Sequence, residues 1–182
     1  MAIANSTTGV WVNNDGLRIE YGATEGQMGI AGEYNQLSST HLTEYDIVYT
    51  DVAQGLTTTN VFILDYTTWF PAEAIIDKVE FVTGTAWATD TSIEFGFVKR
   101  SDFTTIVDAD GLLDAFIVGA RDAAGETTVV LPGGTYAGAL MGVQAGIGFD
   151  SVLSTHWLGA APTAGTGKLR IYWRYAVDTV QS

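Results

Sequence analysis

The feature of this sequence that most constrains its fold is an alternation of apolar and polar side chains with a period of two. It is longest over residues 169–177, where apolar residues alternate with Arg170, Tyr172 and Arg174. Successive side chains of a strand point to opposite faces, so the alternation predicts a long strand with one buried face and one basic-aromatic face. We expect this strand to lie near the middle of a sheet.

Shorter runs of β-prone residues precede this strand. Some of them alternate, and residues 61–64 form the continuous apolar run that is typical of a strand covered on both faces. Pro71 precedes another such run. Proline cannot donate a hydrogen bond to a sheet, so we expect Pro71 to lie at the entry to that strand. We group residues 61–64, 75–82 and 93–98 as one three-strand unit. The remaining predicted strands are residues 44–52 and 127–131.

Residues 110–117 depart from the alternation and predict the one helix of the domain. Asp110 can cap its first turn and Gly119 can end it. Between them, the apolar residues Leu112, Leu113, Phe116 and Ile117 form a stripe at helical spacing.

The composition agrees with an all-β fold. The chain has 21 glycines and 21 aromatic residues (8 Tyr, 8 Phe and 5 Trp), a profile that favours strands joined by tight turns over helices. It has no cysteine, which excludes a disulfide framework and a thiolate metal site. Its 182 residues suffice for a core without such cross-links. We therefore predict a single β-sandwich, jelly-roll-like, with one short helix.

The first part of the chain is predicted to stand apart from this sandwich. Residues 10–12 and 17–21 are short β-prone runs, and the intervening Asp15-Gly16 pair favours a tight hairpin turn. Residues 22–32 are rich in glycine and predict a loop. We divide the chain into an extended N-terminal arm, residues 1–40, and a β-sandwich domain, residues 41–182.

Charge restricts the partners of the chain. Its 8 basic and 21 acidic residues give a net charge of −13, so a phosphate backbone should repel it and we expect no nucleic-acid partner. No apolar run approaches the length of a membrane span, and we expect no membrane partner. The N-terminal residues are small and polar, which predicts the absence of a signal peptide and synthesis in a cytoplasm.

The residues that could carry chemistry form no convincing catalytic set. His41 is expected in a polar loop, and His156 near Ser154 lacks the Gly-x-Ser-x-Gly sequence of a nucleophile elbow. Glu80 and Glu94 could lie on neighbouring strands, but the alternation directs both toward solvent, unlike the carboxylate pair of a glycosidase.

The stretch Asp108-Ala109-Asp110-Gly111, followed by Asp114, begins like a calcium loop. Leu112 then occupies a ligand position and no bidentate glutamate follows, so helix capping by Asp110 is the simpler interpretation. We predict no catalytic residue, no cofactor and no metal.

The polar face of residues 169–177 is a candidate binding surface. Tyr172 lies between Arg170 and Arg174, and tyrosine and arginine are enriched at protein interfaces. We predict that these three residues lie at a subunit interface. The same pattern also fits side chains that cover an edge strand or pair across it, or a tyrosine that stacks on a sugar.

Several stretches resemble small virion structural proteins of tailed bacteriophages. The similarity begins at residues 8–22, which contain the predicted hairpin, and continues in the middle and at the end of the chain. The other similar stretches are residues 70–80, 95–98, 108–113 and 169–173.

The resemblance implies a capsid decoration, or cement, protein. Such proteins commonly form trimers on the outer capsid surface, often through a β-sandwich or jelly-roll body, and tie neighbouring major capsid subunits together. They carry no catalytic residues. The implied partners are the major capsid protein and further copies of this chain in a homotrimer, and the implied location is the virion. In the arm, the candidate contacts with the shell are Trp11, Leu17, Ile19 and Tyr21, which could instead belong to the core of the domain.

Two other function classes remain open. A carbohydrate-binding or receptor-binding tail or fibre module would use exposed aromatic residues, for which Trp87 and Trp157 are the candidates. A sandwich-fold hydrolase would have to use Asp108 or His156.

Overall fold

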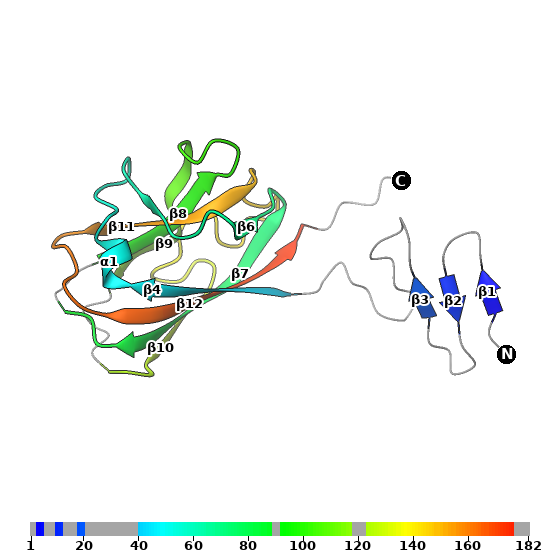
Figure 1. The fold of residues 1–182 in the computed structure, drawn as a ribbon, viewed down its shortest axis with the longest axis horizontal. Coiled ribbons are helices and arrows are strands. Elements are labelled where there is room, and N and C mark those ends of the chain that lie inside the picture. The colour runs from blue at the N-terminus through cyan, green and yellow to red at the C-terminus, as the bar shows by residue number, and fades with distance from the viewer. Residues whose placement is uncertain are drawn as a thin grey trace. The chain divides into compact units, whose positions relative to one another are not determined.

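The computed structural model describes residues 3–5, 10–12, 18–20, 40–88, 92–117 and 123–176. The chain divides into two compact units, Met1–Ser39 and Thr40–Ser182. In the first unit, three short strands form an antiparallel sheet of order β1-β2-β3 (Figure 1). The predicted pairing of residues 10–12 with the following run is present, and the Asp15-Gly16 turn lies outside the described residues. The strands are β1 (Ile3–Asn5), β2 (Val10–Val12) and β3 (Arg18–Glu20).

The second unit consists of two antiparallel sheets that face each other (Figure 1). One sheet has four strands in the order β10-β7-β12-β4, and the other has the order β5-β11-β8-β9 with β6 also paired to β11. The predicted all-β sandwich is thereby confirmed. The first sheet contains β4 (His41–Val48), β7 (Ala74–Thr85), β10 (Thr127–Val130) and β12 (Thr166–Tyr175). The second contains β5 (Phe62–Ile63), β6 (Trp69–Phe70), β8 (Ser92–Lys99), β9 (Ile106–Ile117) and β11 (Ser151–Leu158).

The core of the sandwich is formed by the inward faces of both sheets. Phe81 of β7 packs against Phe116 of β9 with ring centroids 5.2 Å apart, and Phe70 of β6 packs against Trp173 of β12 at 5.8 Å. In β12, Leu169 and Ile171 are fully buried, as the alternation predicts. The strand lies between β7 and β4, so its predicted central position is confirmed.

The predicted helix at residues 110–117 is wrong, because these residues belong to strand β9. The pairing of β9 with β8 is irregular: Phe95 pairs with Leu113, but Phe97 pairs with Asp108. The extra residues bulge out of the ladder and shift the phase of the strand, which places several apolar side chains inward at a spacing that resembles a helix. The described helix is a single turn, α1 (Tyr49–Val52), which directly follows β4.

The predicted three-strand unit is also wrong. Residues 75–82 lie in β7, which belongs to the other sheet from β5 and β8. Strand β11, which the sequence did not predict, pairs with both β5 and β8. Its residues 151–156 are all buried, because the strand is covered on both faces and therefore shows no alternation. No helix in the described parts of the chain is long and apolar enough to cross a membrane.

Candidate functional sites

The predicted interface residues of β12 lie together on the outer face of the first sheet, and each contacts a carboxylate of a neighbouring strand. Arg170 Nε donates to Glu44 Oε2 of β4 at 2.7 Å. Tyr172 Oη donates to Glu80 Oε2 of β7 at 3.0 Å, and Arg174 Nε donates to Asp77 Oδ1 at 3.2 Å. These residues pair across a central strand, so they do not cover a sheet edge. A role at a subunit interface stays a prediction.

The predicted shell contacts of the arm fall partly on described strands. Trp11 of β2 and Ile19 of β3 are paired residues in the sheet of the first unit. Leu17 and Tyr21 lie outside the described residues.

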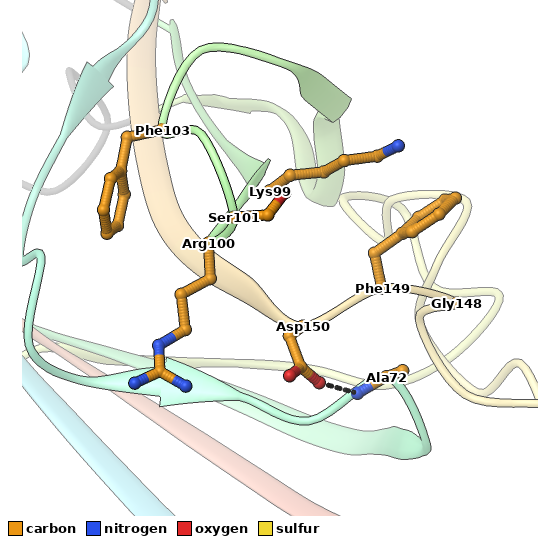
Figure 2. Close-up of a pocket in the computed structure, with 8 residues that line it drawn as sticks. All are labelled: Ala72, Lys99, Arg100, Ser101, Phe103, Gly148, Phe149 and Asp150. Carbon is orange, nitrogen blue, oxygen red and sulfur yellow. Dashed lines mark hydrogen bonds between the residues drawn. The ribbon is translucent and has the colours of Figure 1, made fainter.

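A groove of about 690 Å³ opens at one end of the sandwich, between the turn after β8 and the loop before β11 (Figure 2). Figure 2 shows Phe103 and Phe149 on separate loops, with Lys99 and Arg100 between them. The Nζ atom of Lys99 lies 3.8 Å from the centre of the Phe149 ring. Asp150 Oδ1 accepts a hydrogen bond from the backbone N–H of Ala72 at 3.1 Å, which ties the loop before β11 to the turn between β6 and β7.

Exposed aromatic residues extend from this groove onto β6. Tyr66 is 58% exposed and packs edge-on against Phe103, with ring centroids 5.2 Å apart. Trp69 is 38% exposed, and the Arg100 guanidinium lies 4.2 Å from the centre of its ring. We call the set Tyr66, Trp69, Lys99, Arg100, Phe103 and Phe149 the aromatic-basic patch.

Two aspartates hold the turns that present this patch. Asp65 accepts hydrogen bonds from the hydroxyls of Thr67 and Thr68 at 2.7 and 2.6 Å, and from the Thr67 N–H at 2.8 Å. These bonds lower the pKa of Asp65 to about 2, the Thr68 hydroxyl contributing most. Asp102 accepts from the Thr105 hydroxyl at 2.6 Å and from a backbone N–H of the same turn, and its pKa is lowered in the same way.

An acidic cluster lies on the outer face of the second sheet. Glu94 of β8 is paired in register with His156 of β11, and both side chains are buried. Carboxylate oxygens of Glu94, Asp110 and Asp114 all lie within 4.8 Å of one another. Strand pairing thus brings together groups from three adjacent strands.

Burial raises the pKa of Glu94 to about 7, and the nearby carboxylates of Asp110 and Asp114 act in the same direction. Burial also raises the pKa of Asp108 to about 6, helped by Asp110, and it lowers the pKa of His156.

These positions correct several expectations. Glu94 faces outward as predicted but is only 3% exposed, so it is not in solvent. It does not adjoin Glu80, which lies in the other sheet. Asp110 caps no helix and lies within β9.

The histidine and tryptophan expectations are also corrected. His41 begins β4 and stacks on Trp173 with ring centroids 4.4 Å apart, so it does not lie in a polar loop. Trp87 is 4% exposed and belongs to the core, which removes it as a sugar-stacking residue, and Trp157 is partly buried. The exposed aromatic residues lie instead in the aromatic-basic patch, which the sequence did not single out.

Comparison with known proteins gives no family: no family model and no curated protein matches this chain. A chain in the structure of the capsid of Ralstonia phage GP4 does match. It is 12% identical, with a TM-score of 0.51, and the match covers 84% of this chain and 95% of that one. The two chains share a fold. A chain from the acid-stable capsid of Helicobacter pylori bacteriophage KHP30 matches at 17% identity and a TM-score of 0.40, over 76% and 90% of the two chains. A chain from the cyanophage Pam1 capsid matches at 12% identity and a TM-score of 0.44, and the match covers 85% of this chain and 97% of that one.

Proposed function

We propose that this chain is a structural protein of a tailed-phage virion, of the capsid decoration (cement) type. The observation that carries the proposal is the shared fold with a chain of the Ralstonia phage GP4 capsid, because it extends over 95% of that chain and 84% of this one. The likeness of sequence stretches to phage virion proteins supports the same role. On this proposal the chain forms homotrimers on the outer capsid surface and binds the major capsid protein.

The net charge of the chain supports a position on the outside of the capsid. A chain with a net charge of −13 is repelled by packaged DNA, so the outer surface of a shell suits it better than the inner surface. The proposed role requires no catalysis, and we expect no enzymatic activity.

Two surfaces are proposed for the contacts. The arm residues Trp11, Leu17, Ile19 and Tyr21 bind the shell, where an extended segment can add strands to an exposed sheet edge. Arg170, Tyr172 and Arg174 contribute to the contact between copies. Their carboxylate partners within the chain neutralise the two arginines, which lowers the cost of burying this face in an assembly.

The test is binding of the purified full chain to expanded empty capsids, together with its mass in solution by light scattering. We expect a trimer and saturable cosedimentation at micromolar concentration. The double substitution Trp11→Ala and Ile19→Ala should abolish cosedimentation and leave the thermal unfolding of the sandwich unchanged. Leu131→Ala, at a residue that is 54% exposed on the sandwich, is the matched control and should bind normally. A monomer that does not bind capsids contradicts the proposal.

The aromatic-basic patch favours a second candidate function, a carbohydrate-binding or receptor-binding tail or fibre module. Aromatic faces beside a groove can stack on sugar rings, and Asp150 and Ser101 offer polar groups on its rim. A glycan array distinguishes the two functions. Ligands that bind the wild type and are lost in Trp69→Ala would favour the receptor-binding function, whereas an array without ligands would leave capsid binding as the sole candidate.

A further inference from the structure

The acidic cluster of the second sheet has the dimensions of a cation site. Oxygens that bind one calcium ion at 2.3–2.6 Å can be at most about 5 Å apart. The carboxylate oxygens of Glu94, Asp110 and Asp114 lie within 4.8 Å of one another. Three oxygens from three separate side chains can therefore contact a single ion without rearrangement of the backbone.

A histidine without a hydrogen-bond partner points into this cluster. The His156 side chain is 0% exposed, and neither of its ring nitrogens has a hydrogen-bond partner among the described residues. Its Nε2 atom nevertheless lies 2.6 Å from Glu94 Oε2, without the alignment that a hydrogen bond requires. A buried imidazole in this state is costly, since unsatisfied polar groups lose their bonds to water. An ion that draws Glu94 into place would allow the ring N–H to align with the carboxylate.

In the part of the chain that the structure describes, no lysine or arginine side chain pairs with this cluster. Each lysine and arginine whose side chain the structure describes contacts another group. Lys78, Lys168, Arg170 and Arg174 pair with carboxylates outside the cluster, and Lys99 and Arg100 lie over aromatic rings.

The backbone around the cluster is constrained so that the carboxylates converge. Glu94 lies opposite two residues of β9, because Ile93 pairs with Phe116 while Phe95 pairs with Leu113. Ala115, within this bulge, has a positive φ of 47° and its backbone hydrogen-bonds to the Glu94 carboxylate.

Gly138 packs directly against the backbone of Asp110 and Gly111, with which an added Cβ would collide. Bulges re-aim side chains, and this pair of constraints directs Asp110 and Asp114 toward Glu94.

We propose that Glu94, Asp110 and Asp114 bind one divalent cation, with His156 as the positioning residue that orients Glu94. Calcium fits best, because the three ligands are carboxylate oxygens and calcium accepts six to eight oxygens in flexible geometry. Asp114 is exposed, so water can reach the site and complete the coordination. The site is a property of the isolated chain and is independent of the proposed capsid role.

The test is thermal and urea unfolding of the full chain, first in EDTA and then with CaCl₂ up to about 10 mM, tenfold above the weakest protein calcium sites. A single site at 100 times its dissociation constant shifts the folding equilibrium about 100-fold. We expect a saturable rise in melting temperature, and calorimetry should give one ion per chain. The absence of both a saturable shift and calorimetric binding overturns the proposal.

Variants separate ligation from general charge effects. Asp114→Asn is the first variant because its side chain is exposed and its loss should not impair folding. We expect at least tenfold weaker calcium binding, whereas stability in EDTA equals or exceeds that of the wild type because a like charge is removed. His156→Gln, which keeps an N–H donor, should weaken calcium binding by less than the roughly 10–100-fold that the loss of a group orienting a metal ligand costs.

The matched control is Asp46→Asn, at a side chain that is 83% exposed on the other sheet and pairs with Lys168. Its calcium response should match the wild type. A calcium response that survives Asp114→Asn and Asp110→Asn, or one that Asp46→Asn reduces equally, overturns the proposal, because it would reflect screening of the net charge.

Discussion

At the scale of single residues, aspartates followed by threonines determine how the aromatic-basic patch is presented. Asp65 binds Thr67 and Thr68 in the turn that carries Tyr66, and Asp102 binds Thr105 in the turn that carries Phe103. Phe103 has a positive φ of 55°, a conformation that costs a non-glycine residue free energy and persists only where the surrounding turn enforces it. The patch is therefore held in place by hydrogen bonds that the two aspartates accept from threonine hydroxyls and from backbone N–H groups of the same turns.

Asp65→Asn should lower the stability of the sandwich in a pH-dependent manner. The pKa of Asp65 is lowered to about 2 in the folded chain, so its contribution is complete above its unfolded value near 4 and is lost as the pH falls through 2. Because the side chain is partly solvated, we expect a loss of about 1 kcal/mol at neutral pH. Urea unfolding of both proteins at about pH 7 and pH 2.5 should show the difference shrink at acid pH.

Asp46→Asn is the control for this prediction, since its carboxylate is exposed and lies 3.4 Å from the Lys168 ammonium. Its stability should follow that of the wild type at both pH values. A constant difference between Asp65→Asn and the wild type would mean that the turn is held by something other than the ionised carboxylate.

The acidic cluster shows why a site can escape sequence analysis at this scale. Asp108, Asp110 and Asp114 lie close together in the sequence, but Glu94 and His156 are 14 and 48 residues away from Asp108, so the sequence does not group them into one site. Only the pairing of β8 with β9 and β11 brings them together and buries them. The available signal was that Glu94 and His156 each lie within a run of buried β-prone residues, where an ionisable side chain needs a partner.

At the scale of strands, regular alternation was a reliable guide and bulges were the main source of error. Strands β4, β7, β8, β10 and β12 all overlap predicted runs. In β9, bulges opposite the Ile93–Phe95 and Phe95–Phe97 segments of β8 break the period of two. Leu112 and Leu113 are therefore both buried although they are adjacent. Strand β11 was missed for a related reason, since burial on both faces removes the period altogether.

Gly96 should be essential for the bulge in β9. A Cβ at this position would collide with the backbone of Asp108 and Ala109. Gly96→Ala is therefore expected to cost about 3 kcal/mol or more, because backbone atoms cannot move aside as a flexible side chain can. The measurement is the free energy of unfolding in urea.

Gly125→Ala provides the comparison, because Gly125 has a positive φ of 84° but nothing within 4 Å of the added Cβ. It should cost about 1–2 kcal/mol, the strain of the backbone alone. Equal costs for the two substitutions would show that close packing at Gly96 is unimportant.

At the scale of the whole molecule, the chain combines a β-sandwich with a separate N-terminal unit. The sandwich has its own core, formed by residues from β4 onward. The fragment of residues 40–182 should therefore fold by itself, with cooperative unfolding and a free energy of unfolding within about 1 kcal/mol of that of the full chain, because the core described above lies within the fragment and independent parts contribute additively. The measurements are circular dichroism and urea unfolding.

On the proposed function, this fragment should also lose binding to capsids, because the arm carries the shell contacts. A fragment that binds as well as the full chain would transfer the contact to the sandwich, where the aromatic-basic patch is the first surface to test. Jelly-roll topology and the trimer belong to the same proposal, since neither follows from the likeness of fold.

The most direct test of the central claim is an electron-microscopy map of the virion that contains this protein. The account predicts density for the β-sandwich on the outer surface of the capsid, in groups of three, with the N-terminal unit in contact with the major capsid protein. Density for this chain on the tail or inside the shell, or its absence from the particle, would contradict the account.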